Sequence, residues 1–148
     1  MIIRGADRGD LPVLVDFNLR MAEETEGRQL DPGILEAGVA GVFDRPERGF
    51  YLVAEEAGRT VGSLMVTTEW SDWRNGDFWW VQSVYVRPEF RRQGVFGALY
   101  DEVRKMARQT ERVCGCRLYL EKDNQAALAS YLKRGFIETP YRICEDGF

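Results

Sequence analysis

A basic, glycine-containing turn that directly follows a strand is the first part of this sequence that could do chemistry. Residues 79–86 are β-branched and aromatic, which predicts a strand, and Pro88 ends it because proline cannot donate to a ladder. Residues 91–97 then read Arg-Arg-Gln-Gly-Val-Phe-Gly and lead into a helical pattern. A helix start exposes unpaired backbone N–H groups, and glycine lets an anion approach them closely. The pattern therefore predicts a cradle for a diphosphate.

Taken alone, this motif has more than one interpretation. It lacks the Gly-Lys-Ser/Thr ending of the Walker loop, and its glycine spacing differs from that of the dinucleotide-binding fingerprint. An ordinary turn with a solvated basic pair explains it equally well. A second motif follows at residues 124–136, which read Asn-Gln-Ala-Ala-Leu-Ala-Ser-Tyr-Leu-Lys-Arg-Gly-Phe.

With both motifs present in this order, the chain resembles the GNAT superfamily of acyl-CoA N-acetyltransferases. Its signature is an Arg/Gln-x-x-Gly-x-Gly/Ala turn after a strand, followed by Asn-x-x-Ala-x-x-x-Tyr-x-x-x-Gly-Phe. The part of the chain that carries the motifs runs from Val84 to Phe136, and the order of elements fits the family over nearly the whole chain. Phe96 departs from the pattern, because the family has Gly or Ala at that position.

The resemblance implies a binding mode for the co-substrate acetyl-CoA. The amides of the turn would hold the diphosphate of coenzyme A, and the two arginines would add charge-assisted contacts. The strand would pair its backbone with the pantetheine arm, Asn124 would contact the same arm, and Tyr131 would lie near the thioester sulfur. The implied coenzyme-binding residues are Val84, Tyr85, Val86, Arg91, Arg92, Gln93, Gly94, Val95, Phe96, Gly97, Asn124 and Tyr131.

Direct transfer to an amine needs a neutral amine, a stabilised oxyanion and a protonated leaving thiolate. Tyr131 is the predicted general acid, since a phenol with a pKa of about 10 can protonate a departing thiolate. A half-buried core aromatic is the alternative role for this residue. A backbone N–H near Val84 is predicted to donate to the oxyanion.

The general base is left open by the sequence. Some family members carry a glutamate on the central strand at the place taken here by Trp80. Gln82 shares that side by strand alternation, and its amide could position a water molecule but cannot accept a proton. The remaining candidates are a water chain past Gln82 and the carboxylates Glu23, Glu24, Glu69 and Asp72. Of these, Glu69 is the predicted base.

The predicted acceptor is the primary amine of a small cationic molecule. All four tryptophans fall within residues 70–80, beside carboxylates, where they could form a pocket for an ammonium group or simply pack the sheet. An acidic run at residues 23–26 is expected in a loop between the first two helices, which lines the acceptor groove in this family. The expected acceptor-binding residues are Glu23, Glu24, Asp72 and Trp80.

Composition excludes several other kinds of function. The absence of histidine removes Ser-His-Asp and Cys-His catalysis and most zinc sites, so no metal is expected. A net charge of −4 argues against nucleic-acid binding, and no apolar run is long enough to span a membrane. Three cysteines without framework spacing indicate a reducing compartment, so a cytoplasmic location is expected. Cys114 and Cys116 are interpreted as small buried side chains.

Hydrophobic periodicity and turn signals predict a mixed α/β fold in the order β-α-α-β-β-β-α-β-α-β. Its centre is a parallel, right-handed βαβ unit. Helix caps are expected at Asp10, at Asp31 before Pro32, and at Asp123 or Asn124. A hairpin turn is expected at residues 56–59, which read Glu-Ala-Gly-Arg. The expected strands cover residues 2–4, 50–54, 61–70, 79–86, 117–121 and 136–144, and the expected helices start near residues 11, 32, 95 and 125.

The function predicted from these features is N-acetylation by a single domain, residues 1–148. Acetyl-CoA and an amine acceptor are the expected partners, without nucleic acid or membrane, and a homodimer is left open. One alternative is acetylation of protein lysines or N-termini. Another is a non-catalytic acyl-CoA-binding or sensor module, which the missing strand carboxylate would explain.

Overall fold

The computed structural model describes residues 1–148, which separate into two units, Met1–Leu118 and Tyr119–Phe148. Short 3₁₀ turns at Arg8–Asp10 and Pro88–Phe90 join regular elements of the first unit. The elements of the first unit are β1 (Ile2–Gly5), α1 (Leu11–Glu26), α2 (Pro32–Asp44), β2 (Gly49–Glu56), β3 (Arg59–Ser71), β4 (Gly76–Val86), α3 (Val95–Gln109) and β5 (Val113–Arg117). The second unit contains α4 (Gln125–Lys133).

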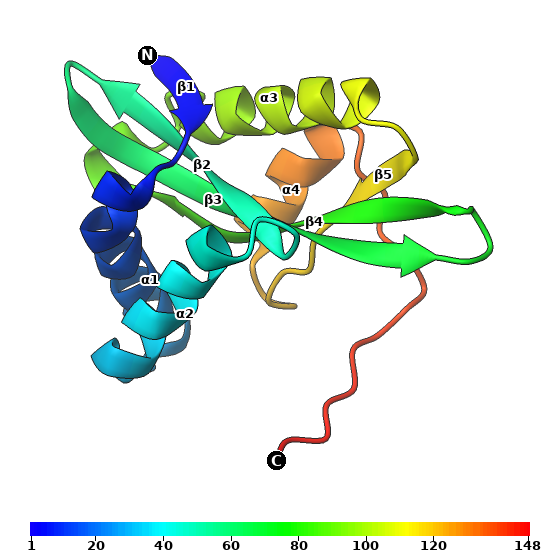
Figure 1. The fold of residues 1–148 in the computed structure, drawn as a ribbon, viewed down its shortest axis with the longest axis horizontal. Helices are drawn as coiled ribbons and strands as arrows, with labels where there is room; N and C mark the ends of the chain where they lie inside the picture. Colours follow the sequence, from blue (N-terminus) through cyan, green and yellow to red (C-terminus); the bar gives the residue numbers. More distant parts are fainter. The chain divides into compact units, whose positions relative to one another are not determined.

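The strands form one five-stranded sheet in the order β1-β2-β3-β4-β5. The first three pairs are antiparallel, and β4 and β5 are parallel because α3 crosses over between them. Within this unit, α1 and α2 cover one face of the sheet and α3 covers the other (Figure 1). The mixed α/β class and the parallel βαβ unit predicted from the sequence are confirmed.

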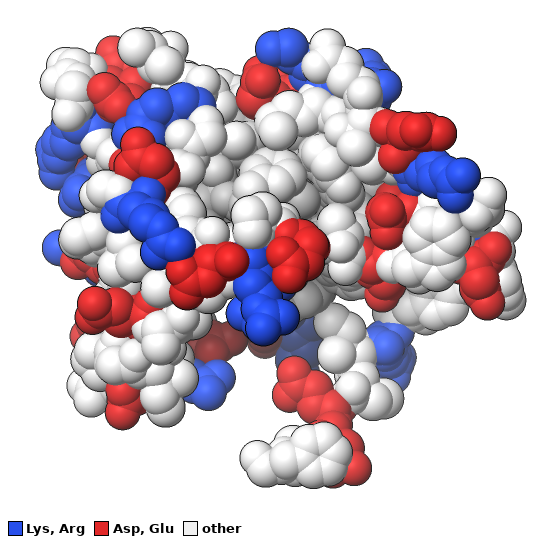
Figure 2. Space-filling model, viewed as in Figure 1, with Lys and Arg blue, Asp and Glu red and all other residues white.

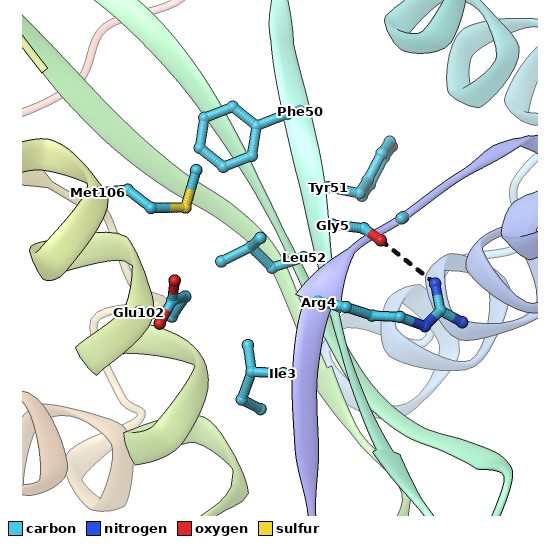
Figure 3. A pocket seen from close by; sticks show the side chains of 9 residues that line it. Ile3, Arg4, Gly5, Phe50, Tyr51, Leu52, Glu102 and Met106 are labelled. Atoms are coloured by element: carbon cyan, nitrogen blue, oxygen red, sulfur yellow. Dashed lines mark hydrogen bonds between the residues drawn. The ribbon is translucent and has the colours of Figure 1, made fainter.

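Strand alternation sends neighbouring residues of β2 to opposite faces of the sheet. Tyr51 and Val53 are buried with Leu14 of α1 and Val39 of α2, and burial raises the pKa of Tyr51 to about 12. Figure 3 shows the other face, where Phe50 and Leu52 point towards α3 while Tyr51 points away. These side chains, with Ile3, Met106 and Glu102, line a cavity of about 400 Å³ that contains none of the predicted site residues.

Local signals in the sequence predict several element ends correctly. Asp31 caps α2, with its Oδ1 accepting from the Ile34 N–H at 3.0 Å, and Pro32 is the first helical residue. The β2–β3 hairpin turns at Ala57 and Gly58, whose φ values are 49° and 73°. Left-handed values at both central residues match the right-handed twist of the flanking strands.

The prediction that the acidic residues 23–26 lie in a loop is wrong, because these residues form the last turn of α1. The helix continues to Glu26 and ends at Gly27, which has a φ of 59°. The Gly27 and Arg28 amides donate to Glu23 and Ala22 carbonyls at 3.0 and 3.1 Å, which satisfies the last turn. Glycine at this position is the signal that would have located the helix end.

The predicted strand at 117–121 is also displaced, since β5 covers Val113–Arg117. Gly115 lies opposite Phe78 in the ladder, and a Cβ on this glycine would lie 3.0 Å from the Phe78 ring. At the strand entrance, a Cβ on Gly76 would lie 2.5 Å from the Arg112 carbonyl oxygen. Small residues therefore let β5 approach the aromatic strand β4, a requirement that strand propensity does not express.

In the second unit, Asn124 rather than Asp123 caps α4, with its Oδ1 accepting from the Ala127 N–H at 3.1 Å. The strands predicted at residues 136–144 are wrong, because this segment forms no ladder. Pro140 lies in its middle and has no N–H to donate.

The surface charges, the helix lengths, the cysteines and the possible metal ligands complete the description. Acidic and basic side chains are interspersed over the face seen in Figure 2. None of the helices has the length and apolar character needed to cross a membrane. Cys114 and Cys144 are exposed and Cys116 is half-buried, so the interpretation of Cys114 as a buried side chain is wrong. The side chains form no group of three or more metal-binding residues.

Asp10 occupies the N-cap position of α1, as predicted, but its carboxylate makes no cap bond to that helix. It accepts instead from Arg4 at 2.7 and 2.9 Å and from the Asp7 amide at 2.9 Å, the latter within the capping box of the preceding 3₁₀ turn. The Arg4 hydrogen bond is the main cause that lowers the pKa of Asp10, outweighing the opposite effect of burial. Arg4 also donates to Glu55 at 3.1 Å, so this pair joins α1 to β1 and β2.

We expect Asp10→Asn to lower the free energy of unfolding at pH 7 by about 2 kcal/mol, since it removes a partly buried charged hydrogen-bond acceptor. The folded-state pKa of Asp10 lies below its ordinary value of 3.8. This contribution is therefore present above pH 3.8 and is lost as the pH falls through the folded-state pKa. Urea unfolding at pH 7 and pH 3 checks this, and an equal loss at both values would contradict it. Asp16→Asn, which breaks an exposed pair with Arg20, is the control.

Candidate active site

A β-bulge in β4 shapes the candidate site. Met65 of β3 pairs with Gln82 of β4, whereas Ser63 of β3 pairs with Tyr85 of β4. A step of two residues along β3 is therefore matched by a step of three residues along β4. The extra residue is accommodated at Ser83, whose φ of 49° is unusual for a residue other than glycine. Gln82 and Tyr85 therefore share a face. The bulge was not predicted from the sequence, because such irregularities are recognised by a glycine or a proline and residue 83 is a serine.

Beyond the bulge, one edge of β4 has no partner strand. The parallel ladder with β5 covers only Asp77–Trp80 of β4, whereas the ladder with β3 continues to Val86. The segment from Val81 to Val86, which includes the predicted coenzyme-binding strand residues, is paired on one side only. An edge of this kind can bind an extended ligand through main-chain hydrogen bonds.

The turn after β4 leads into the start of α3, where the sequence predicts an anion site. Gly94 has a φ of 83°, and no side chain caps the helix. The first amide bonded within the helix is that of Ala98, which donates to the Gly94 carbonyl at 2.9 Å. The preceding amides, such as those of Val95 and Gly97, come before the first intrahelical hydrogen bond and so have no acceptor within the helix. A Cβ on Gly94 would meet nothing within 4 Å, so the space beside Gly94 at the start of the helix is open.

Phe96 stands where the family has Gly or Ala, and its side chain does not displace the amides at the start of α3. Its half-buried ring stacks on Tyr100 one turn along α3, with ring centroids 6.0 Å apart and planes at 10°. The start of the helix is held against the sheet at Gly62, where a Cβ would lie 2.9 Å from Val95 Cγ1. The bulky side chain therefore extends along the helix.

Glu24, predicted to bind the acceptor, lies against two predicted coenzyme-binding residues. Its carboxylate accepts from the Tyr85 hydroxyl at 2.9 Å and from the guanidinium of Arg91. Partial burial pushes the pKa of Glu24 upward, but the hydrogen bonds from Arg91 and Tyr85 outweigh this effect, so the pKa lies below its ordinary value. Glu23, beside it, is exposed at the end of α1.

Glu69, Trp80 and Gln82 lie together on one face of the β3–β4 pair. Thr67 is directly opposite Trp80, and Glu69 is opposite Phe78, so Glu69 and Trp80 are diagonal neighbours. The Glu69 carboxylate accepts from Arg117 at 2.6 Å, and the Gln82 amide donates to the Thr67 hydroxyl. Trp80 and Gln82 are each half-buried.

Arg117 also lies over the ring of Phe78, with its guanidinium carbon 3.6 Å from the ring centroid. The cation that pairs with Glu69 is therefore held on its other side by an aromatic ring.

The other predicted acceptor residue, Asp72, lies in the β3–β4 turn and accepts from the Trp73 amide at 2.9 Å. From Gly76, where β4 begins, to Tyr85 is a span of about 30 Å at roughly 3.3 Å per residue. Asp72 is therefore far from Glu24, which contacts Tyr85. The structure does not gather the four expected acceptor residues into one site.

The tryptophans are dispersed as well, because strand alternation separates them. Trp79 is buried on the α3 face against Phe50, with ring centroids 5.3 Å apart, while Trp80 is on the other face. Trp70 is 54% exposed and Trp73 is 87% exposed in the turn. Proximity in sequence therefore does not produce an aromatic cluster.

In the second unit, Asn124 and Tyr131 are two helical turns apart, at the start and near the end of α4. The Tyr131 ring makes an edge contact with Phe136 at 5.8 Å. Burial raises the pKa of Tyr131 above its ordinary value, so the phenol stays protonated at neutral pH.

These features agree with the comparison of the chain with known proteins. Residues 17–136 match the family model described as acetyltransferase (GNAT) family. The chain belongs to the GNAT acetyltransferase family. A possible acetyltransferase from Clostridium difficile 630 is 39% identical, with a TM-score of 0.92 over 99% of this chain and 97% of that chain. Acetyl-CoA-dependent acetyl transfer is therefore the general activity of this GNAT protein.

More distant structures share the fold. A predicted acetyltransferase with acetyl-CoA from Clostridium acetobutylicum is 18% identical, with a TM-score of 0.80 over 98% of this chain and 95% of that chain. A Trypanosoma brucei acetyltransferase is 21% identical, with a TM-score of 0.72 over 98% of each chain. Among proteins of curated function, none matches this GNAT chain. The uncapped amides of α3 and the open space at Gly94 fit the diphosphate of the family's coenzyme.

We expect Gly94→Ala to weaken acetyl-CoA binding about tenfold, because the methyl group would occupy the space that the diphosphate needs. Alanine at a left-handed position also costs about 1 kcal/mol of stability. Gly58→Ala is the matched control, since its φ is 73° and its Cβ would also meet nothing within 4 Å. It should lose similar stability and keep its affinity. Calorimetric titration and urea unfolding measure the two effects, and equal affinities in both variants would contradict the assignment.

Proposed function

We propose that this GNAT protein transfers the acetyl group of acetyl-CoA directly to the primary amine of a small cationic molecule. The observation that carries the proposal is the placement of Trp80 and Glu69 as diagonal neighbours beside the bulge in β4. An aromatic face next to a carboxylate attracts an ammonium group. The expected site thus holds a cation next to the strand along which the coenzyme would lie.

Acetyl-CoA supplies an activated acetyl thioester in this proposal. The amides at the start of α3, with the side chains of the turn, would hold its diphosphate. The unpaired edge of β4 around Val84 would bind the pantetheine arm, and an N–H there would donate to the thioester carbonyl oxygen. Asn124 would contact the same arm through its amide Nδ2, since its Oδ1 caps α4.

Tyr131 is proposed as the general acid that protonates the departing thiolate. Support comes from the raised pKa of Tyr131, which keeps its proton available at neutral pH. A phenol is also a suitable donor, because it can give up its proton and later recover it from solvent.

Glu69 is proposed as the general base that accepts the proton of the acceptor amine. It is the carboxylate, among those predicted, that shares a face with Trp80 and Gln82. Glu24 already accepts two hydrogen bonds, and Asp72 lies in the distant turn. The Arg117 pair fixes the position of the Glu69 carboxylate, and Gln82 would help to position a water molecule between the base and the amine.

A panel of acceptors with a thiol-release assay tests the proposal. We expect coenzyme A release with small polyamines and related cationic amines, and little with neutral amines or peptides. Turnover confined to lysine-containing or N-terminal peptides would identify a protein acetyltransferase instead. Acetyl-CoA binding without turnover on any amine or peptide would identify a sensor module.

We expect Tyr131→Phe to lower kcat about a hundredfold and to leave the KM for acetyl-CoA unchanged, because it removes only the donated proton. In the wild type, the raised pKa of Tyr131 should delay any alkaline loss of kcat until above its ordinary value of 10.0. Steady-state kinetics between pH 6 and pH 11 check both points. Tyr141→Phe, at a tyrosine that is 74% exposed in the same unit, is the control. An unchanged kcat in Tyr131→Phe at every pH would exclude the acid role.

We expect Glu69→Gln to lower kcat/KM for the amine about a hundredfold at pH 7. The deficit should shrink towards pH 10, since an amine with a pKa of about 10.4 then deprotonates without a base. Asp44→Asn, which breaks an exposed ion pair with Arg8, controls for loss of a paired surface carboxylate. A deficit that stays constant with pH would argue against the base role.

A further inference from the structure

A carboxylate at the end of α1 joins the end of β4 to the first residue of the coenzyme turn. The last turn of α1 places Glu24 so that Oε1 accepts from the Tyr85 hydroxyl at 2.9 Å, while Oε2 accepts from Arg91 Nη2. The three residues come from α1, from the bulged end of β4 and from the first position of the turn. Both oxygens of Glu24 are therefore used in holding this corner of the protein.

Each partner of Glu24 is itself fixed by further contacts. Arg91 Nε donates to the Val86 carbonyl at 2.8 Å, and its guanidinium carbon lies 5.4 Å from the centroid of the Tyr85 ring. The Tyr85 ring is 4% exposed and packs on Phe17 of α1 at 4.9 Å. The side chain of Arg91 is thus directed back onto the end of β4 and onto α1.

The turn that follows needs such support. Arg92 has a φ of 60° and Gly94 a φ of 83°, so two left-handed residues lie within one short turn. A left-handed conformation is unfavourable for a residue with a Cβ and persists where the surrounding structure holds it. Arg92 is exposed and makes no hydrogen bond or ion pair within the protein, in contrast to Arg91.

We propose that Glu24 is a positioning residue for coenzyme binding, which fixes Arg91 and Tyr85 from α1 and thereby holds the turn that presents the α3 amides to the diphosphate. It acts through the turn and touches neither the acceptor nor the reacting atoms. Arg92 is then the arginine whose side chain can reach a phosphate. This inference rests on the proposed function only in taking acetyl-CoA as the ligand of the turn.

The test is a comparison of acetyl-CoA binding by the full chain and its variants, measured by calorimetric titration. Glu24→Ala is expected to weaken binding about tenfold, the size of a typical coupling between two sites. Glu26→Ala removes the same charge from the same turn of α1, and Glu26 makes no ion pair, so this control should bind normally. Wild-type affinity in Glu24→Ala would overturn the inference.

Kinetic measurements separate positioning of the turn from binding of the acceptor. Glu24→Ala should raise the KM for acetyl-CoA and leave kcat and the KM for the amine unchanged. A raised amine KM with a normal acetyl-CoA KM would overturn the inference and assign Glu24 to the acceptor. If the wild type binds acetyl-CoA but acetylates no amine, the proposed function fails while the binding comparison still decides the role of Glu24.

Two milder variants keep the inference falsifiable if Glu24→Ala unfolds. Tyr85→Phe keeps the ring on Phe17 and removes one of the two hydrogen bonds, so a smaller loss of about threefold is expected. Arg91→Lys keeps the charge but has no Nε–H fork to contact both Val86 and Glu24, so it should bind acetyl-CoA as weakly as Glu24→Ala. Normal affinity in both variants would overturn the inference.

Discussion

The first backbone amides of α3 precede the first hydrogen bond within the helix. Several contacts in the first unit hold these N–H groups in place, facing the turn after β4. Such groups must be satisfied by water or by a ligand, and the helix dipole favours an anion. The left-handed Gly94 turns the chain into the helix without a capping side chain. Gly62 lets Val95 approach β3 closely enough to hold the first turn of α3 in place.

The two faces of the sheet have different roles in the proposed reaction. The α3 face carries the helix whose start is proposed to bind the diphosphate, and the opposite face carries α1, α2 and the side chains proposed for acceptor chemistry. The bulge at Ser83 connects these roles, because it turns Tyr85 towards α1 while Gln82 stays beside Trp80. A strand of regular alternation would send one of these two side chains to the other face.

The sequence predicted the features that depend on residues close together in the chain. Hydrophobic periodicity located the helices, and Asp31 with Pro32 and Ala57 with Gly58 marked a cap and a hairpin that the structure confirms. It could not predict which charges meet, because Glu24 and Arg91 are 67 positions apart and Glu69 and Arg117 are 48 apart. The bulge at Ser83 and the position of β5 depend on fit between neighbouring strands, which propensity does not measure. The assignment of Glu24 to the acceptor side followed from the wrong expectation that its segment is a loop.

Helix α1 is held at both ends by arginines that precede or follow it in the chain. Asp10 binds Arg4 at its start, and Glu24 binds Arg91 in its last turn. These ion pairs tie α1 to β1 and to the turn after β4, and they oppose a tilt of the helix that would admit acceptors of a different size. In relatives that keep both ion pairs but accept different amines, we expect the sequence differences to lie in residues 27–31, which connect α1 to α2, rather than in α1 itself.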